Sequence, residues 1–467
     1  MCEPTRRSAV RRMDQGRHAG CPMRLTYSSP ESSLPRHAIV RRLLPFAFVS
    51  GLLAAPVAAA DTLQTAIADA HAWHPAIQTA RAQVRIAAAS VDEVGLGNSL
   101  TATGDFGASM TERTAELSDG SSQSEAKPVF TSARLSLSKR IFDFGRIRGR
   151  VGVEESLLDA ARYQLQVVEQ QVLHDAVIAY LNVFRARARL ELAIKGEELV
   201  QSDLKATQER FEVGDVTPTD VAQAEARLAD RRADRLNREQ DLDQALREYR
   251  LATGSDFSEN AAYPTELPAV PASEIEVEDS AVNMHPAVLM RRARVDAATR
   301  GKDTMVLEIL PTFDVTGTAT YARNPNTFFE SSTDLSVGIG ATVPLWSGGR
   351  VDAAVRSSEE LLGQTRRELD AEMRNVRLQA LSAWHRFRSA SETITALESS
   401  TRANRIASEG VRREAEVGNR TTLDVLNANQ ELLVAEDRLD EARHVLQVAA
   451  YGLLHSTGRM TAEQWGL

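Results

Sequence analysis

The chain contains one sequence pattern twice, and this duplication limits the available folds more than any other feature. The segment EVGDVTPTDV at 212–221 recurs 204 residues later as EVGNRTTLDV at 416–425. Near the start of each copy the offset drifts to 211, where His74-Pro75 matches His285-Pro286. A repeat of this length makes each copy a structural unit with its own helices and strands. Function must then come from what two such units build together.

The first part of the chain is typical of a secretory leader. Arg41 and Arg42 precede an apolar run from Leu43 to Ala55, and small residues follow up to Asp61. A basic segment, a short apolar segment and a small-residue cleavage site form a secretory signal. We therefore assign 1–60 to a signal peptide with an upstream extension, and we expect an exported chain.

Removal of this leader would leave an acidic chain without cysteine. The full sequence has a net charge of −9, and the nine basic and three acidic residues of 1–60 account for a mature charge of −15. Cys2 and Cys21 both lie in the leader, so we expect no disulfide, thiolate metal site or lipid-bearing N-terminal cysteine. The acidic balance argues against a nucleic-acid partner.

Four segments alternate apolar and polar residues with the period of a β-strand. They lie at about 99–110 and 129–142 in the first repeat, and at about 311–322 and 333–345 in the second. Such alternation over about 11 residues predicts strands with one apolar face, long enough to cross an outer membrane when tilted. The polar segment 111–127 is expected to be a loop.

Each pair of strands leads into a long segment without proline. These segments, about 147–212 and 351–416, predict helices on the order of 100 Å long. Apolar residues recur every seven positions along them, as at Leu158, Leu165 and Val172. Seven-residue spacing makes a helix supercoil on its neighbour, so we expect coiled-coil packing.

The boundaries of the units follow from these elements. Each repeat is expected to run helix, strand, strand, long helix and returning helix, over 61–254 and 281–460, with an opening helix at about 62–94. The acidic, proline-bearing segment 255–280 is predicted to be a linker with room for a short strand or helix. Residues 461–467 form a C-terminal tail. The fold class is mainly α with membrane β-structure.

Four strands are too few to seal a barrel in lipid, because bacterial membrane barrels have at least about eight. An open sheet edge in lipid would leave backbone groups unpaired at several kcal/mol each. If the strands cross a membrane, several copies must share one barrel. The helices, which continue from the strands, must then form a second, coaxial tube in an aqueous compartment.

The chain resembles the TolC family of outer-membrane export channels over essentially all of 61–460. The leader, the two-fold repeat, the hairpin that ends in the Phe-Asp-Phe-Gly-Arg run at 142–146 and the two glycine turns carry the resemblance. It implies a homotrimer in the cell outer membrane, with twelve shared strands and a periplasmic α-helical barrel. It also implies docking to an inner-membrane ABC or RND-type transporter through a periplasmic adaptor protein.

This resemblance implies an outer-membrane exit duct. The Phe-Asp-Phe-Gly-Arg turn and the missing anchor cysteine favour type I protein secretion. Efflux of drugs or metals for a proton-driven pump is the alternative within transport, and a secreted coiled-coil scaffold is the alternative from another class. The sequence has no Ser-His-Asp arrangement, phosphate loop or metal-ligand spacing, so we predict neither an enzyme nor a cofactor.

The glycine turns are the predicted tips of the two helical hairpins. Val213-Gly214 and Val417-Gly418 stand where each long helix must turn back, and glycine adopts the left-handed conformation there without steric cost. The resemblance implies that these tips dock the adaptor.

Each tip also has the residues of a helix cap. Thr217 and Thr421 suit the first position of the returning helices, and Asp220 and Asp424 follow at the capping-box spacing. Capping could be the whole role of these aspartates. The other interpretation is that three copies of Asp424 form an acidic ring near the channel axis, which would concentrate cations.

Further roles at the tip follow from the resemblance alone. It implies that Asp424 lines the periplasmic constriction, where Asn427 replaces a second aspartate. It also implies that Thr219, Asp220 and Arg420 take part in links that hold the tip closed. We infer from it that Asp220 pairs with Arg420 of another hairpin.

Two other groups of residues have a structural as well as a functional interpretation. Aromatic residues at the strand–helix junctions suit an interfacial belt, or ordinary packing. The histidines at 71, 74 and 285 invite a metal site, but the recurring His-Pro pairs fit helix starts better. The junction residues are Phe142, Gly145 and Arg146 in repeat one and Trp346, Gly349 and Arg350 in repeat two.

Overall fold

The structure, a computed structural model, describes residues 62–467 except 117, 127–128 and 326–328. The predicted leader lies outside this part of the chain. The first repeat contains α1 (Leu63–Trp73), α2 (Pro75–Gly95), the 3-10 turn η1 (Leu96–Asn98), β1 (Thr101–Ser109), β2 (Glu112–Glu116), β3 (Ser122–Ala126), β4 (Phe130–Phe142), α3 (Arg146–Glu212) and α4 (Pro218–Thr253).

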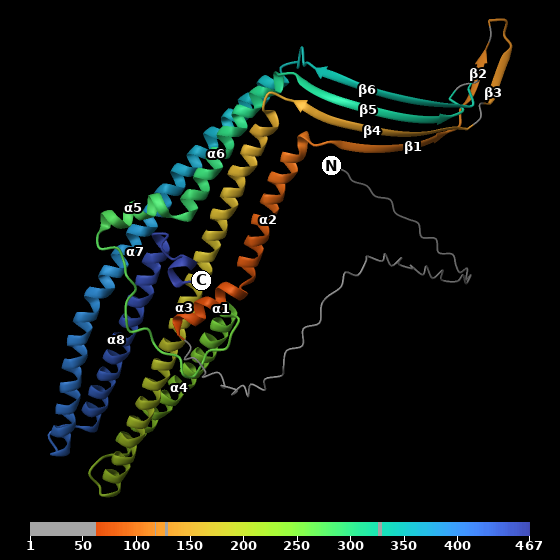
Figure 1. Cartoon of the computed structure of the whole chain (residues 1–467). Coiled ribbons are helices and arrows are strands. Elements are labelled where there is room, and N and C mark those ends of the chain that lie inside the picture. The colour runs from red at the N-terminus through yellow and green to blue at the C-terminus, as the bar shows by residue number, and fades with distance from the viewer. Residues whose placement is uncertain (1–61, 117, 127–128, 326–328) are drawn as a thin grey trace, which may run out of the picture. The chain divides into compact units, whose positions relative to one another are not determined.

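The second repeat has the same order of helices and main strands (Figure 1). It contains α5 (Glu274–Met284), α6 (Pro286–Val306), the 3-10 turn η2 (Leu307–Ile309), β5 (Thr312–Arg323), β6 (Ser331–Thr342), α7 (Arg350–Glu416) and α8 (Thr422–Ser456), and the short η3 (Ala462–Trp465) follows. The predicted fold class is confirmed. The two long helices have 67 residues each.

The opening helix of each repeat is broken, whereas the sequence predicts one helix over about 62–94. Pro75 begins α2 and His74 is extended, with φ −61° and ψ 125°, because a residue before proline is disfavoured in the helical region. The His74 Nδ1 atom accepts from the Ala76 N–H at 3.3 Å, and His285 Nδ1 accepts from Ala287 N–H at 3.2 Å. Both His-Pro pairs therefore start helices.

The segment 111–127, expected to be a loop, contains a second hairpin. Strands β2 and β3 pair antiparallel from Glu112–Ala126 to Glu116–Ser122. Gly120 in the turn has φ +79°. Because the residues of this hairpin are almost all polar, no apolar alternation reveals it. Similarly, α5 begins inside the predicted linker, as the counterpart of α1.

The four main strands form one antiparallel sheet in the order β1-β4-β5-β6. The central pair, β4 and β5, joins the two repeats, with Leu135 opposite Ala319 and Leu137 opposite Gly317. Strands β1 and β6 are the edges. Large apolar side chains on the sheet are exposed, including Phe106 at 85% and Val337 at 79%.

The main apolar core lies where α1, α3, α4 and α8 meet. Leu173, Val177 and Tyr180 of α3 are fully buried there against Tyr249 of α4 and residues of α1 and α8. The Tyr180 hydroxyl donates to the Ala262 carbonyl at 2.7 Å, which fixes the segment between the repeats. Within the described ranges, no helix combines the length and apolar character needed to cross a membrane.

Candidate functional site: hairpin tips, junction and histidine groove

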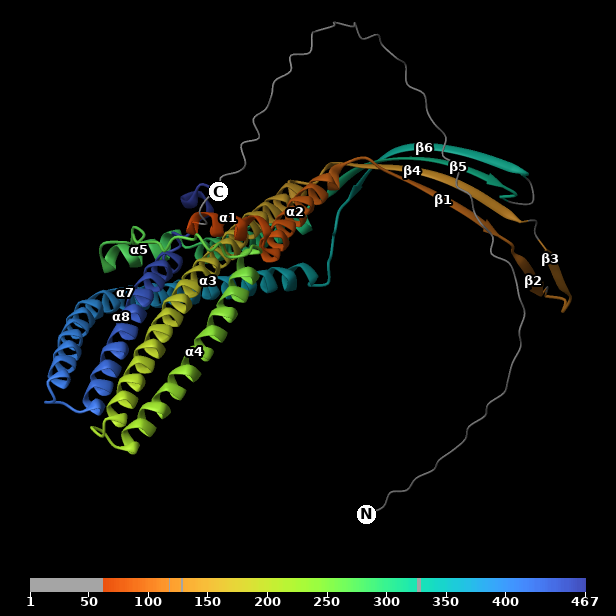
Figure 2. The same ribbon diagram turned by 90° about the horizontal axis from the view of Figure 1, so that it is seen from below.

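The tips of the α3–α4 and α7–α8 hairpins lie at the same end of the helices in both views (Figures 1 and 2). Gly214 and Gly418 have φ +84° and +81°. At the first tip, the Gly214 N–H donates to the Phe211 carbonyl and the Asp215 N–H to the Arg210 carbonyl, each at 2.9 Å. The second tip makes the equivalent bonds. This is the Schellman arrangement, so the predicted left-handed glycines are confirmed.

Both returning helices begin with the predicted capping box. The Thr217 N–H donates to Asp220 Oδ2 at 2.8 Å, and the Thr421 N–H donates to Asp424 Oδ2 at 3.0 Å. These backbone hydrogen bonds lower the pKa of both carboxyl groups. Both aspartates are therefore ionised at neutral pH. The capping role is confirmed, whereas the acidic ring involves other copies and stays a prediction.

Within the single chain, the predicted latch residues make local contacts. Arg420 Nε donates to Glu414 Oε2 at 2.8 Å, on the same hairpin. Asp220 is engaged in its cap, and Thr219 is exposed at the first tip. The structure of one chain therefore brings Asp220 and Arg420 into separate local networks, and their pairing across hairpins stays a prediction.

A link between the two hairpins was missed by the sequence analysis. Arg227 Nη2 of α4 donates to Asn427 Oδ1 of α8 at 3.0 Å. Two residues further along α8, buried Asn429 accepts from Ser408 Oγ at 2.8 Å and donates to Asp203 Oδ2 at 3.3 Å. The burial of Asp203 raises its pKa. The sequence does carry a signal for this network. Asn429 lies in a row of apolar residues, and an amide that is buried there needs a hydrogen-bonding partner.

The strand–helix junction of repeat one is a fixed turn. Phe144 has φ +55° and Gly145 φ +83°. Buried Asp143 holds this turn: its Oδ1 accepts from the Gly145 N–H at 3.0 Å and its Oδ2 from the Ile147 N–H at 2.8 Å. Phe142 packs edge-on against Phe144, with ring centres 4.6 Å apart.

Arg146 links this junction to the second repeat through hydrogen bonds. Its Nη2 atom donates to the carbonyls of Leu307 and Leu310 at 3.0 and 2.9 Å, and its Nη1 lies 3.7 Å from Glu308. The junction of repeat two differs. Trp346 is 89% exposed, and Arg350 is exposed as well. Gly349 has φ +80°, as Gly145 does.

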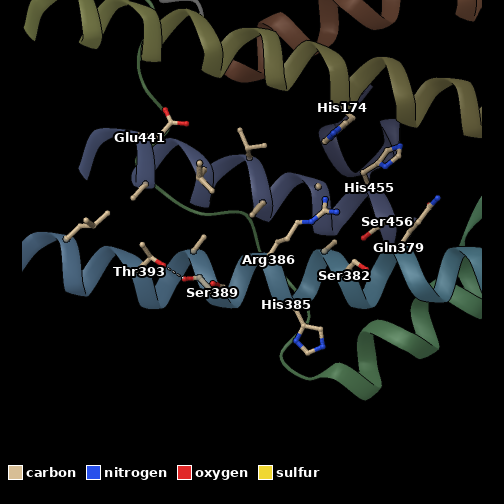
Figure 3. Close-up of a pocket in the computed structure, with 18 of the residues that line it drawn as sticks. His174, Gln379, Ser382, His385, Arg386, Ser389, Thr393, Glu441, His455 and Ser456 are labelled. Atoms are coloured by element: carbon tan, nitrogen blue, oxygen red, sulfur yellow. Dashed lines mark hydrogen bonds between the residues drawn. The ribbon is translucent and has the colours of Figure 1, made fainter. Parts of the chain in front are cut away.

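A groove of about 1160 Å³ opens between α7 and α8, and His174 and Arg189 of α3 also line it. His174 of α3 stacks on His455 of α8 with ring centres 4.8 Å apart (Figure 3). Burial, with a smaller effect of the His174 charge, lowers the pKa of His455 to about 4. His385 points away from α8 on the other side of α7 (Figure 3). No three His, Cys, Asp or Glu side chains in the described ranges are grouped as metal ligands would be.

The buried His455 should make the stability of the fold depend on pH. In the unfolded chain a histidine gains a proton near pH 6.5, but folded His455 does so only near pH 4. Stability is therefore lost as pH falls from about 6.5 toward 4. For this histidine alone we expect a loss of about 2 kcal/mol at pH 5.

Thermal unfolding in detergent at pH 7.5 and pH 5 tests this effect. His455→Gln should show a smaller fall of the unfolding midpoint between the two pH values than the unchanged chain. Exposed His385→Gln on α7 is the matched control and should behave like the unchanged chain. An equal fall in all three proteins would contradict the assignment.

Comparison with known families identifies this arrangement. The sequence model described as outer membrane efflux protein matches 66–255 and 278–459, one segment in each repeat. The chain belongs to the outer membrane efflux protein family. The predicted location in the outer membrane is confirmed by this membership, as is the resemblance to the TolC family.

Several relatives of this outer membrane efflux protein are known. Outer membrane efflux protein BepC of Brucella suis is 32% identical, over 89% of each chain. Alkaline protease secretion protein AprF of Pseudomonas aeruginosa is 28% identical, over 66% of each chain. The Campylobacter jejuni CmeC outer membrane channel shares the fold, with a TM-score of 0.73 and 15% identity over 85% of this chain and 86% of CmeC.

Proposed function

We propose that three copies of this chain form the outer-membrane exit duct of a type I protein secretion system. The observation that carries the proposal is the four-stranded sheet, whose edges β1 and β6 have no neighbouring strand in the described part of the chain. Its exposed apolar side chains suit lipid. Closing such a sheet in a membrane takes strands from further copies.

The relatives support secretion as the transport role. Besides AprF, they include the Proteases secretion protein PrtF of Dickeya chrysanthemi, which is 23% identical over 70% of this chain. The efflux alternative is favoured by one observation, the 32% identity to BepC, which is named as an efflux protein. Both roles use the same duct and differ in the transporter behind it.

Partners would dock at the hairpin tips. Val213 is 79% and Val417 is 72% exposed, each directly before the glycine of its hydrogen-bonded turn. One exposed valine at the end of each hairpin suits an apolar groove on a periplasmic adaptor protein. An inner-membrane transporter of the ABC class would complete the assembly.

Cross-complementation separates the two transport roles. We expect the chain to restore secretion of alkaline protease to a Pseudomonas aeruginosa strain that lacks AprF. A Brucella suis strain that lacks BepC should stay sensitive to toxic small molecules. The reverse pattern would establish efflux, and failure in both strains, with the protein present in the outer membrane, would contradict the exit-duct role in those systems.

The acidic ring at the constriction is tested by ion selectivity. In planar bilayers Asp424→Asn should reduce the preference for cations, because three negative charges leave the constriction. Thr421→Ala is the control, since it weakens the same cap but keeps the carboxylate. If the reversal potential under a salt gradient is the same for Asp424→Asn and the unchanged chain, the ring is not the filter.

The latch is tested by channel opening. We propose that Arg420 leaves Glu414 and pairs with Asp220 of another copy in the closed channel, with Thr219 beside it. Arg420→Ser should then raise the open probability of single channels several-fold. Arg413→Ser, at another exposed arginine in the last turn of α7, should not. Equal open probabilities for both variants would rule out the latch.

A further inference from the structure

The contact between the two repeats inside one chain is a template for the contact between two chains. We call it the internal seam: β4 and α3 of repeat one against β5 and α6 of repeat two. It contains the β4–β5 ladder, the packing of α3 on α6, and the bonds from Arg146 to the carbonyls of Leu307 and Leu310. Repeat two carries the counterparts of β4 and α3 on its free side, as β6 and α7. Repeat one carries the counterparts of β5 and α6, as β1 and α2.

The burial of equivalent residues differs sharply between these surfaces. On α6, Ala297 is 5% exposed in the internal seam, whereas its counterpart Ile86 on α2 is 67% exposed. On the other side, Gly152 of α3 is buried, whereas its counterpart Arg356 of α7 is exposed. The exposed residues on the free faces of α2 and α7 are therefore the counterparts of residues that the internal seam buries on α6 and α3.

The side chains of the free faces are complementary to one another in size. In the internal seam Gly152 faces Arg300, so closely that a Cβ atom on Gly152 would lie 2.8 Å from Arg300 Nη1. At the equivalent positions α7 has the large residue, Arg356, and α2 the small one, Ala89. If the two free faces met in the register of the internal seam, the Arg356 guanidinium would fill the same space from the opposite helix. Glu93, one turn from Ala89, supplies a carboxylate near it.

The strands show the same exchange. In the internal seam Leu137 of β4 faces Gly317 of β5. Leu137 corresponds to Ala341 on β6, and Gly317 corresponds to Phe106 on β1. The large residue of the pair is therefore again on the opposite strand. Phe106, which is 85% exposed in the single chain, would cover Ala341.

The turn at η1 has the same hydrogen bond as the turn at η2, whose backbone carbonyls bind an arginine. At η2, the Leu310 N–H donates to the Leu307 carbonyl at 3.1 Å, and this turn presents the two carbonyls that Arg146 binds. At η1, the Ser99 N–H donates to the Leu96 carbonyl at 2.7 Å. The turn is the same, and its carbonyls face no arginine of the described part of the chain. Arg350, the counterpart of Arg146, is the exposed arginine at the start of α7.

We propose that α7 and β6 pack on α2 and β1 of a second copy in the register of the internal seam. Arg350 then donates to the carbonyls of Leu96 and Ser99 of that copy, and Arg356 lies over its Ala89. The inference rests on the proposed trimeric duct and adds which residues join its subunits. We call this contact the outer seam.

Engineered disulfides test the register, since residues 61–467 contain no cysteine. The double variant Glu93→Cys with Ala353→Cys should give covalent dimers and trimers after mild oxidation of outer-membrane preparations. These positions correspond to Thr304 and Gly149 of the internal seam, where a Cβ atom on Gly149 would lie 3.4 Å from Thr304 Cβ, a separation that a disulfide can span. Gln83→Cys with Ala353→Cys is the control. Gln83 lies on another face of α2 and should give monomers.

The outcomes separate the register from the assembly. Trimers by native mass spectrometry without the 93–353 disulfide would overturn the outer seam and leave the duct intact. Monomers in mild detergent would overturn both. As a second measurement, Arg350→Ala should increase the fraction of dissociated subunits at a fixed temperature about tenfold, the loss expected for one or two hydrogen bonds. Arg366→Ala, at an exposed arginine further along α7, should not, and equal dissociation of both variants would contradict the role of Arg350.

Discussion

Replacing Gly458 by alanine should destabilise the fold by about 2–5 kcal/mol. Gly458 follows α8 with φ +73°, and an added Cβ would lie 2.7 Å from the Cα atom of His285. The left-handed conformation costs an alanine about 1–2 kcal/mol, and overpacking against backbone adds about 1–3 kcal/mol. The Gly458 carbonyl also accepts from buried Gln170 at 2.8 Å, so a shift of this turn would break a buried hydrogen bond.

The measurement is thermal unfolding followed by the helical circular dichroism signal in detergent. Gly214→Ala is the matched control, because Gly214 has φ +84° but an added Cβ would meet nothing within 4 Å. It should lose only the conformational part, about 1–2 kcal/mol. Equal losses in the two variants would show that the close approach to His285 does not limit this turn.

The second large effect is expected for Asp143→Ala at the strand–helix junction. The side chain is 5% exposed, and it accepts from two backbone N–H groups at the start of α3. Hydrogen bonds to a charged group contribute about 1.5–3 kcal/mol each, and a carboxylate at a helix N-terminus is favourable. We expect a loss of about 3 kcal/mol, because alanine leaves both donors without their partner.

The repeat supplies the control for this substitution. Ser347 occupies the equivalent position before α7 and is half-buried. The turn there has glycine at 348 and 349, both with positive φ, so the backbone needs less support from a side chain. Ser347→Ala should change the unfolding midpoint little. A small effect of Asp143→Ala, comparable to that of Ser347→Ala, would show that the carboxylate does not hold the junction.

The long helices and the tips could be predicted from the sequence because their signals are local. Helix α3 ends at Glu212, where Gly214 and then Thr217 and Asp220 lie within a few positions of each other. Glycine, threonine and aspartate in that order determine a turn by their own conformational and hydrogen-bonding preferences. No distant contact is needed to recognise them.

Contacts between distant parts of the chain could not be predicted in this way. Arg227 and Asn427 are separated by 200 residues, and Arg146 and Leu310 by 164. An arginine on a predicted helix gives no information about which carbonyl or amide it reaches after folding. The β2–β3 hairpin was missed for another reason, since a strand pair with polar residues on both faces has no apolar period.

The internal seam has a consequence for the order in which the proposed trimer assembles. Its two sides are tethered in one polypeptide, so they meet at a high effective concentration whatever the amount of protein. Of the six seams around a closed ring, three would form inside single chains and three would need an encounter between chains. Dilution should therefore slow ring closure without affecting the folding of each β4–β5 pair.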